Sequence, residues 1–154
     1  MKRYTFLILI MVLLFLTIGC VTPIADISEN PQKYSGKEVV INGTIFNVVN
    51  IPLVDSSLFL FGDEENKIPV VSSVKHEKGE AYLLKGRVMA FPEEGSKEAS
   101  REVIGSIADF LVEKEVVEEK KADKAATSIL KGLYRLSEGL GQMFFIIEKD
   151  DPQQ

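Results

Sequence analysis

The stretch that decides the fold is VVINGTI at residues 39–45, which recurs as YLLKGRV at residues 82–88. Both copies alternate apolar residues with other residues around a central glycine, Gly43 in the first and Gly86 in the second. An alternation of period two predicts β-strands. A glycine inside a strand is destabilising unless the backbone must bend or be approached closely there. Two strands with matched glycines therefore favour a small closed barrel over a flat sheet.

Shorter apolar runs, bounded by turn residues, predict the remaining strands. With the two long strands included, the expected set is 39–49, 58–61, 68–72, 81–91 and 143–147. A short helical turn is expected over Ile24–Glu29, before the turn signal Asn30-Pro31.

The region between the last two strands has a helical pattern instead. Val103, Ile107 and Phe110 recur at helical spacing, and Ile129 and Leu133 begin a second apolar stripe. A run of charged residues at 113–125 separates the stripes. The pattern predicts two helices, or one long helix that bends near residues 120–125.

The N-terminal residues have the features of an export leader. Lys2 and Arg3 precede an uncharged apolar run at residues 4–18. This order of a basic and then an apolar region is typical of a secretory signal.

The apolar run ends at Gly19-Cys20, which resembles the lipobox of bacterial lipoproteins. That family usually has Leu where this chain has Thr17. The resemblance implies a signal peptide at 1–19 and a diacylglycerol on the Cys20 thiol, so that acyl chains hold the mature protein on a membrane. An uncleaved membrane-spanning helix over 4–21 and plain secretion are the alternatives.

The composition narrows the class of protein. A chain of 154 residues is one domain by length. One His and one Cys exclude an intrachain disulfide and a multi-ligand Cys/His zinc site. Loss of residues 1–19 would leave 16 Lys and Arg against 23 Asp and Glu, a net charge of −7 instead of −5. Long-range attraction to nucleic acid is therefore not expected.

The segment from Ile24 to Gly43 resembles exported OB-fold proteins of the tRNA-anticodon-binding-like group. The shared features are Asn30-Pro31, then Tyr34-x-Gly36-Lys37, then a strand with a central glycine. The resemblance implies a β-rich α+β fold. The expected architecture is a five-stranded OB-fold barrel, with a helical insertion between strands four and five, after a lipoprotein signal peptide.

This resemblance divides the chain into parts. After the signal peptide come a leading segment with the lipidated cysteine at 20–35, the OB-fold domain at 36–149 and a polar tail at 150–154. The helical insertion occupies about 95–141, beside the usual ligand face of an OB-fold. The helices either cover that face or provide a new contact surface.

Few residues are candidates for a catalytic or metal-binding role. His76 lies among charged residues, and the sequence predicts a solvated loop histidine rather than a metal or haem ligand. The acidic run at 63–65, where that group usually has an Asp-x-Thr-Gly turn, does not have calcium-loop spacing and predicts a solvated turn. We expect no enzyme activity, no cofactor and no metal site.

The resulting functional prediction is a lipid-anchored binding or assembly module on the periplasmic or cell-surface face of a membrane. An envelope protein or a glycan is the expected partner. The outer face of the first three strands, together with the helices, is the expected contact surface. Candidate ligand contacts are Thr44, Phe46, Lys85 and Arg87. The alternative is binding of single-stranded nucleic acid or oligosaccharide through the OB-fold groove.

Overall fold

The computed structural model describes residues 21–51, 56–92, 96–141 and 144–149. Its elements in chain order are α2 (Ile24–Glu29), α3 (Pro31–Tyr34), β1 (Glu38–Asn50), β2 (Ser57–Gly62), β3 (Lys67–Ser72), β4 (Ala81–Ala90), α4 (Lys97–Glu113), α5 (Glu119–Ser137) and β5 (Phe144–Glu148).

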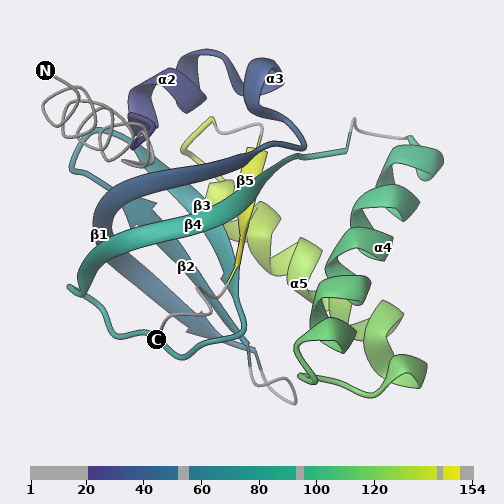
Figure 1. The fold of residues 1–154 in the computed structure, drawn as a ribbon. Helices are drawn as coiled ribbons and strands as arrows, with labels where there is room; N and C mark the ends of the chain where they lie inside the picture. Colours follow the sequence, from purple (N-terminus) through teal and green to yellow (C-terminus); the bar gives the residue numbers. More distant parts are fainter. Residues whose placement is uncertain (1–20, 52–55, 93–95, 142–143, 150–154) are drawn as a thin grey trace, which may run out of the picture.

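The five strands close into a barrel in the order β1-β2-β3-β5-β4 (Figure 1). Strands β3 and β5 run parallel, and every other neighbouring pair is antiparallel. The mixed five-stranded barrel with its helices is an OB-like α+β fold, as the sequence predicts.

The matched glycines lie where strands of the barrel approach each other closely. A Cβ atom on Gly86 would lie 2.8 Å from the carbonyl oxygen of Ile147 in β5, and one on Gly43 would lie 2.9 Å from the carbonyl oxygen of Gly62 in β2. Real Cβ atoms do not come this close to backbone. The two glycines therefore permit the close strand contacts of the barrel, which confirms the interpretation of the repeat.

Side chains that point into the barrel form one of two buried clusters. Phe59 and Phe61 of β2 belong to it, as the period-two pattern predicts, and both are fully buried. Helix α2 adds Ile24 and Ile27 to the same cluster, so this short helix packs against side chains of the barrel interior.

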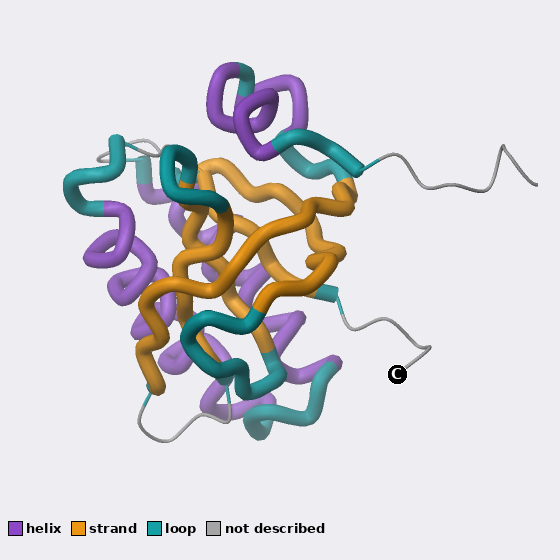
Figure 2. The backbone as a smooth tube through the Cα atoms, turned by 90° about the vertical axis from the view of Figure 1, so that its left-hand side faces the viewer, coloured by secondary structure: helices purple, strands orange, loops and turns teal. Residues whose placement is uncertain are grey.

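The second buried cluster lies outside the barrel, between its wall and the helices. Helix α5 contacts β2 and β3, and α4 packs against α5. Leu58 of β2 and Val71 of β3 join Ile129 and Leu133 of α5 in this cluster. Figure 2 shows α4 and α5 behind the strands, with the short N-terminal helices above them. All six residues of β2 and five of the six in β3 are consequently buried.

Two separate helices form the helical region. Helix α4 begins after Ser96, whose side-chain oxygen accepts a hydrogen bond from the Ala99 N–H, which is the usual capping contact. The chain turns at Glu115, which has a positive φ of 54°. The interruption lies at residues 114–118, so the alternative of one helix bending near 120–125 is wrong.

Cys20 and the rest of residues 1–20 lie outside the described residues. Within the part of the chain that the structure describes, no helix has the length and apolar character needed to cross a bilayer.

Candidate functional site

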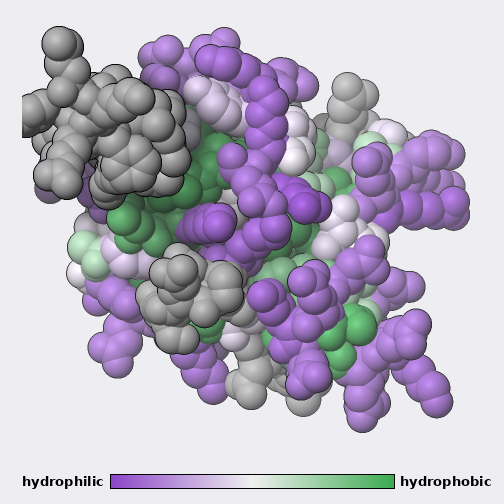
Figure 3. All heavy atoms as spheres, viewed as in Figure 1, coloured by the Kyte–Doolittle hydropathy of each residue, from purple (hydrophilic) through white to green (hydrophobic). Residues whose placement is uncertain are grey.

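A groove of about 460 Å³ lies between α4 and the barrel wall made by β4 and β5. This volume is within the range of ordinary small-ligand sites. Helix α4 packs against α5 and lies beside the part of the barrel that β4 and β5 form (Figure 1). On the face drawn in Figure 3, hydrophilic side chains predominate, with smaller hydrophobic areas between them.

The barrel wall of the groove is basic. Lys85 and Arg87 are on the outward face of β4, on either side of the inward-facing Gly86, and Lys149 follows β5. The Lys149 N–H donates to the Lys85 carbonyl oxygen at 2.8 Å, which places the two residues side by side.

One acidic residue, Glu38 of β1, partly balances these cations. It forms an ion pair with the Lys149 ammonium. The hydrogen bond and charge of Lys149, with smaller effects from Lys85 and Arg87, hold the pKa of Glu38 below its usual value. Lys85 and Arg87 themselves form no ion pair within 4.0 Å among the described residues.

The helix wall of the groove is formed by one face of α4. Ser106, Asp109, Phe110 and Glu113 recur at spacings of three and four, so they share a face. The two carboxylates are exposed, and Phe110 is buried. Lys114, which follows α4, also lines the groove. The helix side therefore carries two carboxylates and one cation, whereas every charged residue on the barrel side is basic.

The four candidate ligand contacts separate in space. Lys85 and Arg87 line the groove together, whereas Thr44 and Phe46 are not among its lining residues. Thr44 and Phe46 are half-buried on β1, and the ammonium of Lys67 lies 4.7 Å from the centre of the Phe46 ring. Sequence reasoning did not find Lys149, because only the β4–β5 pairing brings it to Lys85.

The outer face of β2 and β3 is not an open surface. Helix α5 covers it, with Gly132 so close that a Cβ atom there would lie 2.5 Å from the Leu58 Cδ1 atom. The expectation that the outer face of the first three strands is the contact surface is therefore wrong for β2 and β3. The usual OB-fold ligand face includes these strands.

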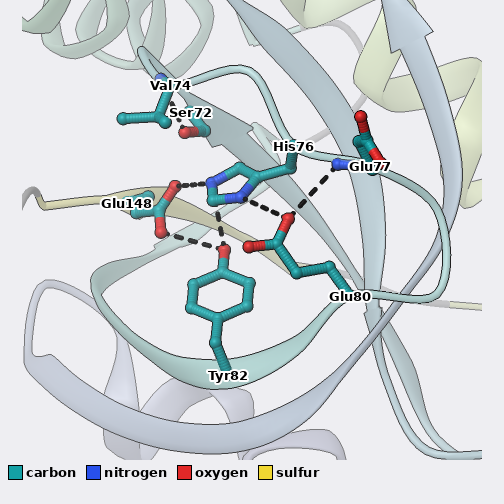
Figure 4. Close-up of polar contacts among 7 residues, drawn as sticks. All are labelled: Ser72, Val74, His76, Glu77, Glu80, Tyr82 and Glu148. Atoms are coloured by element: carbon teal, nitrogen blue, oxygen red, sulfur yellow. Dashed lines mark hydrogen bonds and ion pairs between the residues drawn. The ribbon is translucent and has the colours of Figure 1, made fainter.

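Apart from the groove, the structure contains a polar cluster inside the opening of the barrel, made of His76, Glu80, Tyr82 and Glu148 (Figure 4). The His76 Nε2 atom is 3.1 Å from the Glu148 Oε2 atom, and the His76 Nδ1 atom is 3.3 Å from the Glu80 Oε2 atom. The Tyr82 hydroxyl donates to the Glu148 Oε1 atom at 2.9 Å. The imidazole stacks on the Tyr82 ring and meets the edge of Phe59.

The prediction of a solvated histidine is therefore wrong: the His76 side chain is only 9% exposed. The charged residues next to His76 in the sequence predicted an exposed side chain, but its main partner, Glu148, is 72 residues away in the sequence.

The two carboxylates decide the protonation of this cluster. Burial acts to lower the pKa of His76, but the hydrogen bonds and charges of Glu148 and Glu80 outweigh burial and raise it above the ordinary value of 6.5. Burial, assisted by Glu148, also raises the pKa of Tyr82, so this hydroxyl stays a donor.

The cluster holds the connection before β4 against the barrel. The carboxylates face both ring nitrogens of His76, so the imidazole acts as an ion-pair partner rather than as a base with an open nitrogen. Next to it, the Gly79 N–H donates to the Ile45 carbonyl oxygen of β1 at 2.8 Å. Across the described ranges, no three His, Cys, Asp or Glu side chains are placed to hold a metal ion.

The acidic turn after β2 is exposed, as predicted. The Asp63 Oδ1 atom accepts hydrogen bonds from the backbone N–H groups of Glu65 and Asn66, at 2.9 and 2.6 Å. This carboxylate stabilises its own turn.

Comparison with known proteins adds no assignment. No protein-family description matches the chain, and no curated protein matches it in sequence.

Proposed function

We propose that this protein is a lipid-anchored, non-catalytic binding module of the cell envelope, which holds a partner protein in the groove between α4 and strands β4 and β5. The observation that carries the proposal is the arrangement of the helices. Helix α5 covers the outer face of β2 and β3, while the charged groove stays open on the neighbouring wall.

The leader sequence supports the membrane location. A basic start, an apolar run and Gly19-Cys20 form the pattern of a lipoprotein leader. Val21 next to the cysteine lacks the Asp that often retains lipoproteins in the inner membrane, which favours the outer membrane or cell surface.

Nucleic acid or oligosaccharide binding through the usual OB-fold groove is less well supported. That mode needs exposed aromatic side chains on the central strands. Here Phe59 and Phe61 are fully buried in the barrel interior, and Leu58 is covered by the helices. The expected net charge of −7 also opposes attraction to phosphates.

The anchor is tested by the intact mass of the protein extracted from membranes, compared with a Cys20→Ala variant. We expect a mature chain that begins at Cys20 and carries a diacylglycerol, and an unprocessed chain for the variant. An unmodified chain that begins at Met1 in both samples would refute the anchor.

The partner is tested by a photo-crosslinking residue placed in the groove at Ser106. The matched control is Ser128 on α5, because both hydroxyls donate to the carbonyl oxygen four residues earlier and neither side chain is buried. We expect one discrete envelope-protein adduct from position 106 only. Equal adducts from both positions, or none from position 106, would argue against the groove as the partner surface.

A further inference from the structure

The walls of the groove carry opposite charges that do not neutralise each other directly. Lys85 and Arg87 are exposed on β4, and Asp109 and Glu113 are exposed on α4. In the described part of the chain, no ion pair within 4.0 Å joins these four side chains. Both rows of charge are therefore available to a ligand that lies between them.

The surface between the two walls is apolar. Met89 of β4, Phe110 of α4 and Ile147 of β5 line the groove there. Phe110 and Ile147 are each 7% exposed, and Met89 is half-buried. A ligand that follows the groove thus meets cations along β4, two carboxylates along α4 with Lys114 after the end of the helix, and apolar surface beneath.

We infer that the groove binds a short peptide segment with an acidic side chain toward β4, a basic side chain toward α4 and apolar side chains between them. This inference rests on the proposed function, since it specifies the segment of the partner protein. Charge complementarity selects the occupant, because the cations of β4 attract an acidic side chain and the two carboxylates of α4 attract a basic one. A polyanion such as nucleic acid meets Asp109 and Glu113, so it is disfavoured.

The same geometry explains why the walls do not simply close on each other. Helix α4 is fixed by its packing on α5, through buried residues that include Ile107 and Leu111. The barrel wall is fixed by the β4–β5 pairing. Two rigid walls keep the groove ready for a ligand, which reduces the ordering cost of binding.

The test is an NMR titration of the isotope-labelled full-length chain in detergent micelles. The probes are three capped pentapeptides: Glu-Leu-Ala-Leu-Lys, Glu-Leu-Ala-Leu-Glu and Lys-Leu-Ala-Leu-Lys. We expect the first to shift the amide signals of α4 and β4, and to bind at least about fivefold more tightly than the other two.

Charge reversal separates this inference from a general loss of folding. In a Lys85→Glu, Arg87→Glu variant β4 carries two carboxylates opposite those of α4, and Lys149 and Lys114 are the cations left among the lining residues. The doubly basic peptide should then become the preferred probe. The matched control is Lys120→Glu, Lys131→Glu on the exposed face of α5, which should leave the original preference unchanged. The spectrum of each variant reports directly whether it is folded.

Three results would overturn the inference: no shifts at the groove with the mixed peptide, tightest binding of the doubly acidic peptide, or an unchanged preference in the β4 variant. If these occur while the adduct at position 106 persists, the binding function stands and only the stated ligand chemistry is wrong. If the adduct and the lipid are also absent, the proposed function fails as well.

Discussion

The packing of α5 on the barrel can be measured with a pair of glycine substitutions. Gly105 lies in α4 and Gly132 in α5, and both are interior helix positions. A Cβ atom at Gly105 would have no neighbour within 4 Å, whereas one at Gly132 would lie 2.5 Å from the Leu58 Cδ1 atom. Alanine therefore tests the same backbone change with and without a steric contact.

The two expected effects have opposite signs. Replacement of an interior helix glycine by alanine stabilises a helix by about 1 kcal/mol. Overpacking of a well-packed contact costs about 1–3 kcal/mol. Gly105→Ala should thus raise the free energy of unfolding by up to about 1 kcal/mol. Gly132→Ala should leave it unchanged or lower it by up to about 2 kcal/mol, because the clash opposes the helix gain.

The assay is urea unfolding of the full-length chain in a mild detergent, followed by far-ultraviolet circular dichroism. A third variant combines Gly132→Ala with Leu58→Val, which removes the Cδ1 atom that the new methyl group would meet. The rescue is measured against Leu58→Val alone, since loss of a buried methylene has its own cost of about 1 kcal/mol. In the Leu58→Val background, Gly132→Ala should raise the free energy of unfolding by most of the amount expected from replacing a helix glycine with alanine.

Equal stabilisation by Gly105→Ala and Gly132→Ala would refute the reasoning. It would mean that the Leu58 side chain can move away from the new methyl group at little cost, so that the contact between α5 and β2 is looser there than described. An absence of rescue by Leu58→Val would place the steric conflict elsewhere.

Three further predictions concern the barrel and its polar cluster. The pKa of His76 is raised in the folded protein, so its protonation stabilises the fold fully below about pH 6.5, and this stabilisation is lost as the pH rises through the folded pKa. His76→Gln should therefore flatten the decline of the free energy of unfolding with rising pH, as measured by urea unfolding at several pH values. Glu148→Ala removes the shared partner of His76 and Tyr82, and should lower the free energy of unfolding by about 3 kcal/mol near pH 6. The loss should be smaller at pH 9, because His76 is less charged there. An equal loss at both pH values would contradict the ion pair between His76 and Glu148. Gly86→Ala would bring a methyl group within 2.8 Å of backbone and should destabilise by about 3 kcal/mol or prevent folding, as judged by thermal unfolding, whereas wild-type stability would show that the strand contact is looser than described.

The barrel was predictable because its signal is local and doubled. Alternation of period two identifies strands, and the glycine at the same place in each copy identifies where strands must approach. Gly43 and Gly86 meet this requirement in the structure, each against the backbone of a different neighbouring strand.

The covering of β2 and β3 was not predictable from the same signals. The stripe of Ile129 and Leu133 shows that α5 buries one face, but an apolar stripe does not specify what it packs against. The β2 run offered a hint, since Leu58 and Leu60 are apolar on the outward side of the strand as well. Strands that are buried on both faces have such continuous apolar runs.

The polar cluster was missed for a different physical reason. A histidine acquires its properties from the groups that face it, and here these groups come from separate segments of the chain. Glu80 is four residues from His76 and could have been suspected, but Glu148 reaches it only through the closure of the barrel by β5.

Barrel closure and the charge of the groove are linked through one stretch of β4. Gly86 must face inward to let β5 approach, and in a strand its two neighbours must then face outward. Those neighbours are Lys85 and Arg87, whereas the matching positions beside Gly43 are the uncharged Asn42 and Thr44. The structural glycine thus sets the direction of the cations but not their identity. Their charge can therefore be reversed without touching the barrel interior, which makes the binding preference of the groove separable from folding.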